Sequence, residues 1–332
     1  MKQVVVRSVR PRLVSLALGA SVAAIAAGTA GSAAAQCAPD PTVANGTTTC
    51  QGTDADGLVV ATNSRVVVAA GARVGPLVLT RSSTGSSTIA SLDNSGTVAS
   101  RTGAAVAGTA RDTGFVGLSA LTNQPGAVIA GANGGVAVTV GRLTNAGRID
   151  GGAGSAYAVP GSSSSVIFPS SVTNSGSLLS DSAAATLFFS FGSPGISNSG
   201  RIENLGSGAA IESPRETIGV ANAATGVIAS AGPVAVRSGF QLSMNNAGTI
   251  IGSVEGGSGF NDYIDNRAGT ILGDVRLNGG DDHLIARAGD ARLVDGISGA
   301  IDGGAGTDVL ELIVGRDRTV SGIERPAGFE VV

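Results

Sequence analysis

The chain has 332 residues, of which 52 are glycine, 3% are aromatic and none is tryptophan. Charged residues make up only 14% and hydrophobic residues 42%, a balance unlike the low hydropathy and high charge of disordered chains. The formal net charge is −3, and the arginines are scattered singly along the chain, which argues against a nucleic-acid partner. The composition suits an ordered, thin fold lined by small aliphatic side chains.

Residues 1–35 have the features of a signal peptide. Basic residues open the segment, residues 13–30 are uncharged and rich in alanine and leucine, and small residues precede the bond between Ala35 and Gln36. A transmembrane anchor is the alternative, because the apolar stretch is nearly long enough to span a bilayer. The small residues favour cleavage after Ala35, so we expect export. Cleavage removes four of the 21 basic residues and none of the 24 acids, which leaves a net charge of −7.

Residues 36–57 are expected to form an N-terminal cap. They contain the only two cysteines of the chain, Cys37 and Cys50. An even pair in an exported protein is expected to form a disulfide, and the absence of nearby histidine or a C-x-x-C motif disfavours a metal or redox role. We therefore predict a disulfide that pins the cap over an otherwise open strand edge.

A short phrase, asparagine followed closely by glycine and then by an aliphatic residue, recurs along residues 58–313. Clear examples are Asn94-Ser95-Gly96-Thr97-Val98 and Asn246-Ala247-Gly248-Thr249-Ile250. Successive asparagines are 29, 22, 29, 24, 24, 24 and 20 residues apart. A period in this range is typical of stacked repeats. The asparagines are Asn94, Asn123, Asn145, Asn174, Asn198, Asn222, Asn246 and Asn266.

The residue types of the phrase indicate the shape of the repeat. Asparagine and glycine tolerate the backbone of a tight corner, and the valine, isoleucine or threonine that follows favours an extended, half-buried segment. One such unit cannot bury a core alone, whereas stacked units can. Helical and leucine-rich repeats lack support in the sequence. We therefore predict an all-β solenoid of about a dozen coils over residues 58–313.

The C-terminal part of this region contains two glycine- and aspartate-rich segments. Residues 303–310 match the G-G-x-G-x-D-x-aliphatic nonapeptide of calcium-binding β-rolls, in which carboxylate and carbonyl oxygens bind the ion. A roll needs tandem copies, but the partial copy at residues 279–282 lies 24 residues upstream, the length of one coil. Two stacked corners are therefore the favoured interpretation, and Asp282 and Asp308 are only weak calcium candidates. No cofactor is expected.

Catalytic signals are sparse. His283 is the only histidine, and its neighbours Asp281 and Asp282 are acids that could orient its ring, but no nucleophile is marked beside it. Nucleophile-elbow, phosphate-loop and zinc-protease motifs do not occur. The mature chain lacks lysine and tryptophan, so it is thinly equipped for acting on polysaccharides. We expect an exposed loop histidine and no catalysis.

Taken in order, these features resemble the passenger regions of bacterial autotransporters, which are exported by type V secretion. The resemblance rests on the signal segment, residues 50–57, the asparagine–glycine corners, residues 279–282 and 303–308, and the closing Gly328-Phe329-Glu330 phrase. It implies a single-stranded right-handed parallel β-helix at the cell surface, at the outer membrane or released. No segment resembles the C-terminal translocator barrel of that family. Residues 314–332 are therefore expected to be a truncated end or to continue into a missing translocator, present in cis or in trans.

Three functions follow as hypotheses. The first is a surface-displayed or secreted structural rod, an adhesin that contacts a host or cell-surface receptor or other cells through exposed serine, threonine and asparagine. The second is a polysaccharide lyase or glycosidase on the same scaffold, which three or more acids and arginines meeting in one groove would favour. The third is a calcium-dependent binding module, which chelation would destabilise.

Overall fold

The computed structural model describes residues 36–80, 88–108, 116–159, 171–289, 293–314 and 326–330. The chain divides into two compact units, residues 1–33 and 34–332, and the second is considered below by itself. The predicted signal peptide lies outside the described residues, as does Ala35 of its predicted cleavage site. Within the described ranges the chain contains strands and no helix, which confirms the all-β prediction.

One sheet is a ladder of strands from successive coils, here called ladder A. Its internal pairs from β2 to β30, and the pair of β30 with β33, are parallel. The strands are β1 (Gln36–Ala38), β2 (Thr47–Gln51), β5 (Arg65–Val68), β8 (Thr88–Asn94), β11 (Val116–Asn123), β14 (Thr139–Asn145), β17 (Ser171–Asn174), β20 (Gly195–Asn198), β23 (Ile218–Asn222), β25 (Leu242–Asn246), β27 (Tyr263–Asp265), β30 (His283–Ala288), β31 (Val294–Asp295) and β33 (Val309–Ile313).

The second sheet contains two further parallel ladders, which meet in the long strands β24 and β26. Ladder B consists of β3 (Thr53–Asp54), β6 (Arg73–Val74), β9 (Thr97–Ser100), β12 (Val128–Gly131), β15 (Arg148–Asp150), β18 (Ser177–Ser180), β21 (Arg201–Asn204), the first parts of β24 (Val227–Ser238) and β26 (Thr249–Glu255), and β28 (Thr270–Leu272). Ladder C consists of β4 (Leu58–Val60), β7 (Leu77–Leu79), β10 (Val106–Gly108), β13 (Val136–Ala137), β16 (Tyr157–Val159), β19 (Leu187–Phe189), β22 (Ile211–Ser213), the last parts of β24 and β26, β29 (Val275–Arg276) and β32 (Ile301–Asp302).

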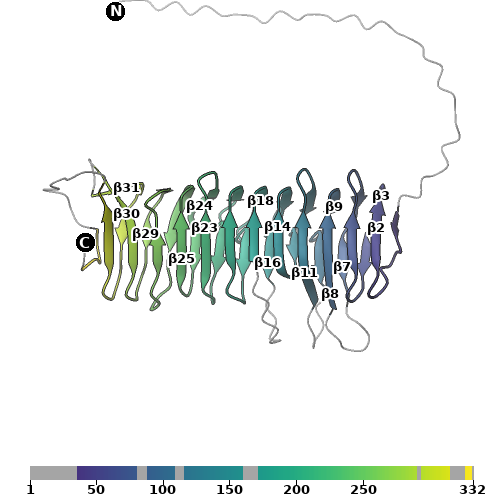
Figure 1. Cartoon of the computed structure of the whole chain (residues 1–332), viewed down its shortest axis with the longest axis horizontal. Helices are drawn as coiled ribbons and strands as arrows, with labels where there is room; N and C mark the ends of the chain where they lie inside the picture. The colour runs from purple at the N-terminus through teal and green to yellow at the C-terminus, as the bar shows by residue number, and fades with distance from the viewer. Residues whose placement is uncertain are drawn as a thin grey trace, which may run out of the picture. The chain divides into compact units, whose positions relative to one another are not determined.

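From β2 to β29, each coil passes through the ladders in the order A, B, C. For example, β8 is followed by β9 and β10, and the chain then returns to ladder A as β11. Repeating this path stacks the strands side by side along the long axis of this unit (Figure 1). The pairing is therefore the repeating parallel arrangement of a β-solenoid. The parallel pairing already begins at β2 and β3. The repeats therefore start earlier than residue 58, the start that the sequence predicted.

The core is a set of stacked columns of aliphatic side chains. In ladder B, Val98, Ile129 and Ile149 lie on successive coils in exact register and are fully buried. In ladder A, Leu92, Leu121 and Leu143 belong to a similar column. Alternate side chains of each strand face this interior, because successive residues of a strand point to opposite faces. The other side chains form the outer faces of the solenoid.

Candidate functional site

The asparagines of the repeated phrase form one continuous ladder of side-chain hydrogen bonds inside the A–B corner. Each is 0–3% exposed, and each of the first seven donates from Nδ2 to Oδ1 of the asparagine on the next coil at 2.7–2.8 Å. The ladder runs through Asn94, Asn123, Asn145, Asn174, Asn198, Asn222, Asn246 and Asn266. The corner asparagines therefore stack in register along eight successive coils.

The second amide hydrogen of these side chains is also used. Asn174 Nδ2 donates to the main-chain carbonyl of Arg201 at 3.1 Å, and Asn94, Asn123 and Asn145 make the equivalent bond. The amide supplies two donor hydrogens and an acceptor oxygen. It can therefore accept from the asparagine of one neighbouring coil, donate to the asparagine of the other, and donate to a main-chain carbonyl that follows the corner. An aspartate would lack the donors, which explains why asparagine occupies this position.

The glycine of the phrase is explained by close approach of the backbone of the preceding coil. A Cβ atom on Gly176 would lie 2.0 Å from the carbonyl oxygen of Gly147, and one on Gly200 would lie 2.1 Å from that of Gly176. Real Cβ atoms do not come so close, so a larger residue would push neighbouring corners apart. The asparagine and the glycine thus serve one packing arrangement.

Both ends of the asparagine ladder meet other groups. Toward the N-terminus, the position of Asn94 is paired with Val68, so the ladder begins at Asn94. At the other end, Asn266 Nδ2 donates to the carbonyl of Gly296 at 3.2 Å, in place of a ninth asparagine. The ladder is therefore finite and its last donor is satisfied.

A second ladder, made of acids, lies at the C–A corner of the C-terminal coils. The main-chain N–H of Asp262 donates to Asp282 Oδ1 at 2.7 Å, that of Asp282 to Asp308 Oδ1 at 2.8 Å, and that of Asp308 to Glu330 Oε2 at 2.6 Å. Asp262 Oδ1 in turn accepts from Leu242 N–H. We call these four residues the acid ladder. Each carboxylate takes the place of a main-chain acceptor for the preceding coil.

The acid ladder has unusual electrostatics. Burial raises the pKa of Asp262 to about 7 and that of Asp282 to about 6, against the opposing effect of the main-chain hydrogen bonds that these carboxylates accept. Neighbouring acids raise the pKa values further, and burial also raises the pKa of Asp308. Within the described residues, the Oδ2 atoms of Asp282 and Asp308 are buried without a hydrogen-bond partner. The corner is therefore costly to ionise fully.

The two weak calcium candidates, Asp282 and Asp308, thus lie on successive coils of the acid ladder. Each uses Oδ1 to accept a main-chain N–H of the preceding coil. In the described parts of the chain, no group of three or more His, Cys, Asp or Glu side chains is arranged to hold a metal ion. The geometry is that of stacked corners, and whether calcium binds is left to the chelation experiment below.

His283 begins strand β30 on the outer face of ladder A and is only partly exposed, so the expectation of an exposed loop histidine is wrong. Its Nε2 is 3.1 Å from Glu311 Oε2 on the next coil, and its ring contacts Tyr263 edge to face at 5.6 Å between centroids. The two acids beside it in the sequence, which could have oriented its ring, bond elsewhere: Asp282 belongs to the acid ladder and Asp281 accepts an N–H from Thr307. Glu311, 28 residues away, was not foreseen.

Ladder C carries a column of alternating charges that the sequence analysis missed. Glu212, Arg237, Glu255, Arg276 and Asp302 occupy paired positions on successive coils. Arg237 Nε donates to Glu255 at 2.8 Å, and looser contacts of 3.7 and 3.8 Å join Arg237 to Glu212 and Arg276 to Glu255. The alternation favours this register over one that places like charges together.

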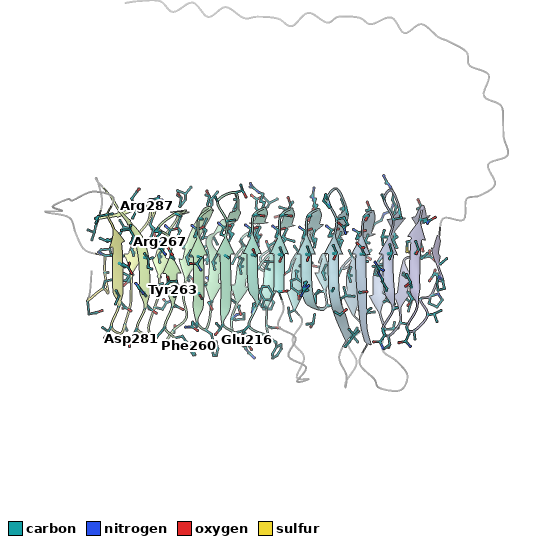
Figure 2. The ribbon with its side chains drawn as sticks, in the orientation of Figure 1. Glu216, Phe260, Tyr263, Arg267, Asp281 and Arg287 are labelled. Atoms are coloured by element: carbon teal, nitrogen blue, oxygen red, sulfur yellow. A yellow bond between two sulfur atoms is a disulfide. The ribbon has the colours of Figure 1, made fainter. Side chains whose placement is uncertain are left out.

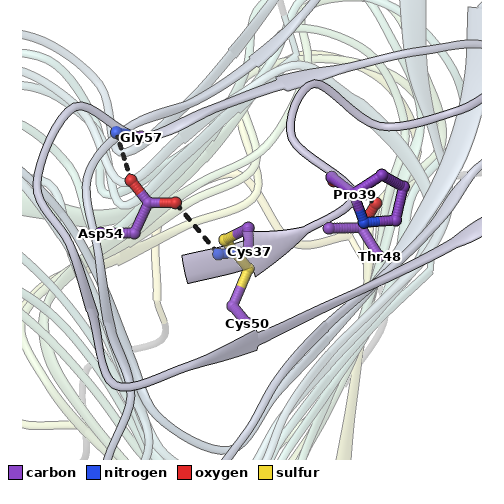
Figure 3. Close-up of a disulfide and its surroundings, with 6 residues drawn as sticks. All are labelled: Cys37, Pro39, Thr48, Cys50, Asp54 and Gly57. Atoms are coloured by element: carbon purple, nitrogen blue, oxygen red, sulfur yellow. Dashed lines mark hydrogen bonds between the residues drawn. A yellow bond between two sulfur atoms is a disulfide. The ribbon is translucent and has the colours of Figure 1, made fainter. Parts of the chain in front are cut away.

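The predicted disulfide is confirmed and closes the N-terminal end of ladder A. Cys37 on β1 faces Cys50 on β2, in the antiparallel pair that covers the edge of the parallel ladder. Asp54 accepts the N–H groups of Cys37 and Gly57, and the two bonds tie the cap to the first corner (Figure 3). The cap thus protects an edge that would otherwise be open to pairing with another chain.

Comparison with known proteins identifies no relative of this chain. No protein-family model, no curated protein and no solved structure matches the chain. Among the described residues, no helix is long and apolar enough to cross a membrane.

Proposed function

We propose that this chain is an exported, non-catalytic, autotransporter-type passenger rod that mediates adhesion at a cell surface or after release. It would be a right-handed parallel β-helix of about a dozen coils. Its partner would be a receptor on a host cell or on another bacterium, contacted at many shallow points. An outer-membrane translocator, in cis or in trans, would deliver it.

The observation that carries the proposal is the unbroken asparagine ladder from Asn94 to Asn266, within three parallel strand ladders. It fixes every corner relative to the next, so the outer faces form an extended and rigid surface. That surface is polar and shallow: exposed positions of ladder A include Thr173, Ser197 and Asn245. Such a surface suits multivalent contact, in which many weak sites add up to firm attachment.

Two further features support the details. A parallel strand–crossover–strand connection is right-handed in almost all known sheets, which supports the proposed hand. The disulfide between Cys37 and Cys50 suits an oxidising compartment and so supports export. The resemblance to autotransporter passengers links the fold to secretion and adhesion.

The catalytic alternative has less support from the described residues. A shallow groove lies on the outer face of strands β20, β23, β25 and β27 of ladder A. Its charged lining residues are one acid and one arginine, Asp265 and Arg267, and they are paired with each other. Three or more convergent acids and arginines were the arrangement expected for a lyase or glycosidase. The polysaccharide-acting enzyme therefore stays an alternative to be tested by assay.

The test uses the purified chain coupled to fluorescent beads. We expect such beads to bind to cultured epithelial cells or to bacterial cells several times more than beads coated with the reduced, unfolded chain. A panel of polysaccharides is incubated with the same protein and monitored for new reducing ends and for unsaturated products. If the beads attach to none of the cells tested, the adhesive role is refuted. If any polysaccharide is broken down, the proposal that the chain is non-catalytic is refuted.

A further inference from the structure

A shallow groove of about 250 Å³ crosses the outer face of strands β20, β23, β25 and β27. Four of its lining residues, Ser197, Ala221, Asn245 and Asp265, are paired in register on successive coils. With strands ~4.8 Å apart, the groove extends about 14 Å along the solenoid axis. It is therefore a linear site that spans several coils.

The hollow arises because side chains become smaller at this point of the column. The preceding coils carry Thr144 and Thr173 at the position that Ala221 occupies in β23. Ala223 and Ala247, which follow the ladder asparagines, also line the groove. Beneath them, the amide hydrogens of the ladder asparagines are already engaged within the stack. The floor thus offers methyl groups and little hydrogen-bonding capacity.

The polar groups of the groove lie at its sides and at one end. Asn245 and Ser197 are exposed, and their side chains have no hydrogen-bond partner among the described residues. Arg267 binds Asp265 through Nε and Nη2 at 2.7–3.1 Å, which leaves its Nη1 group without a partner in the described chain. Figure 2 shows Arg267 near the edge of this face and Tyr263 further in.

The groove is electrically neutral overall. Burial acts to raise the pKa of Asp265, but the hydrogen bonds and charge of Arg267 hold it below its ordinary value, so the pair is ionised at neutral pH. Each charge is compensated by the other at close range. An anionic ligand would have to compete with Asp265 for the guanidinium, and a cationic one would meet Arg267.

A peptide strand does not suit this face. Strands add to sheets at edges with unpaired main-chain groups, whereas the strands under the groove pair with a neighbour on each side. A ligand lying here must carry its own closely spaced donors and acceptors and also present an apolar side to the alanine floor. Sugar rings have both properties: hydroxyl groups at the rim and C–H groups on the faces.

We propose that this groove binds a neutral saccharide chain lying along the solenoid axis. Its hydroxyl groups would bind Ser197, the Asn245 amide and Arg267 Nη1, and its C–H faces would pack on Ala221, Ala223 and Ala247. The inference rests on the proposed adhesive function and names the ligand class at one contact of the rod. The alanine floor and neutral ion pair distinguish this stretch from the threonine-lined coils before it.

The test is a glycan array of neutral, sulfated and uronate-containing oligosaccharides, probed with the full chain, followed by calorimetry on the best neutral ligand. We expect binding to a neutral oligosaccharide. Ala221→Leu, which fills the groove from an exposed position, and Asn245→Ala, which removes the amide, should each weaken it about tenfold or more. Thr144→Leu, at the same column position outside the groove, is the matched control and should change affinity less than about twofold.

Circular dichroism and the melting temperature verify that each variant is folded. Absence of binding to every neutral saccharide, binding only to sulfated or uronate-containing glycans, or unchanged affinity in Ala221→Leu would each overturn the proposal. The bead assay separates it from the adhesive function. Adhesion by the unmodified chain without binding to any neutral saccharide would leave the function standing and the ligand class wrong, whereas saccharide binding without any adhesion would refute the function.

Discussion

Asn174 donates its side-chain amide to Asn198 Oδ1, 24 residues along the chain, at a distance of 2.8 Å, and to the main-chain carbonyl of Arg201 at 3.1 Å. This pair is one link of the ladder that runs inside the A–B corner. Because both partners are fully buried, neither can exchange its bond for one with water. The stability of the coils should therefore depend strongly on the amide chemistry of these residues.

Replacing Asn198 by aspartate tests the asparagine ladder. The carboxylate keeps the size of the side chain but removes the donors to Asn222 Oδ1 and to the carbonyl of Val227. We expect a loss of about 2–4 kcal/mol in the free energy of unfolding, measured by denaturant titration. Thr173→Ala, at an exposed position of the neighbouring strand, is the control and should cost less than about 1 kcal/mol. Equal effects of the two substitutions would contradict the ladder's importance.

A pair of glycine substitutions tests the stacking of the corners. Gly176→Ala would place a methyl group 2.0 Å from the carbonyl oxygen of Gly147, whereas Gly195→Ala has no atom within 4 Å of its added methyl group. Overpacking of this kind costs about 1–3 kcal/mol, so Gly176→Ala should lower the melting temperature and Gly195→Ala should not. A melting temperature that falls equally in both variants would show that the corners do not pack as described.

The acid ladder predicts that the C-terminal coils lose stability as pH rises. The pKa values of Asp262 and Asp282 are raised to about 7 and about 6, above the ordinary value of 3.8, so the folded state holds protons that the unfolded state releases. The stability that these two carboxyl groups contribute is therefore fully present below pH 4, and it is lost as the pH rises through 6 and 7. Hydrogen exchange of residues 262–313 should be faster at pH 8 than at pH 5, after correction for the intrinsic pH dependence.

Asparagine at both positions supplies the control for this pH effect. Asp262→Asn with Asp282→Asn keeps the Oδ1 acceptors for Leu242 and Asp262 N–H but cannot ionise. The difference in protection between pH 5 and pH 8 should shrink markedly. Asp274→Asn, at a partly exposed acid paired with Arg276, should leave it unchanged. A pH effect that persists in the double variant would assign it to other groups.

Calcium is tested on the same ladder by chelation and addition at pH 8. Carboxylate oxygens are suitable calcium ligands, and two of them are buried without a partner among the described residues. On the stacked-corner interpretation, neither EDTA nor millimolar calcium should change the melting temperature. An increase with calcium that Asp282→Asn abolishes would instead support the calcium-dependent module.

Charge reversal tests the alternating column on ladder C. Arg237→Glu would place three glutamates on successive coils, with Glu212 and Glu255 on either side. Partly exposed pairs contribute little, so we expect a loss of about 1 kcal/mol at low ionic strength that added salt reduces. Arg215→Glu, at an exposed position outside the column, is the control. A loss independent of salt would point to side-chain packing as the cause.

Features marked by a short local motif could be predicted from the sequence, whereas contacts between coils could not, because they depend on the number of residues in each coil. The asparagine corners and the disulfide were predictable because each is marked by residue type. The charge column, by contrast, has no fixed spacing in the sequence. From Glu212 to Arg276, successive partners are 25, 18 and 21 residues apart, because the number of residues per coil varies. Without the register, no spacing marks them as neighbours.

The contacts between coils and the groove proposed as a binding site were hidden for a related reason. His283 pairs with Glu311 because equivalent positions on adjacent coils lie side by side, although adjacent acids in the sequence offered a simpler partner. Glu330 continues a row of aspartates with a longer side chain, which obscures the pattern. The groove depends on small side chains at Ala221 and Ala223, and alanine is too common in this chain to mark a site.

The central claim, that coils stack in one fixed register, is tested most directly by engineered disulfides. Thr173 and Ser197 are paired on adjacent strands, so cysteines there would have Cα atoms ~4.8 Å apart, within disulfide reach. Thr173 and Asn245 lie in the same column three coils apart, at about 14 Å. We predict efficient intramolecular oxidation of the Thr173→Cys/Ser197→Cys variant and none for Thr173→Cys/Asn245→Cys, measured by mass spectrometry of the monomer. Equal cross-linking of both variants, or none in the first, would contradict the stacked register.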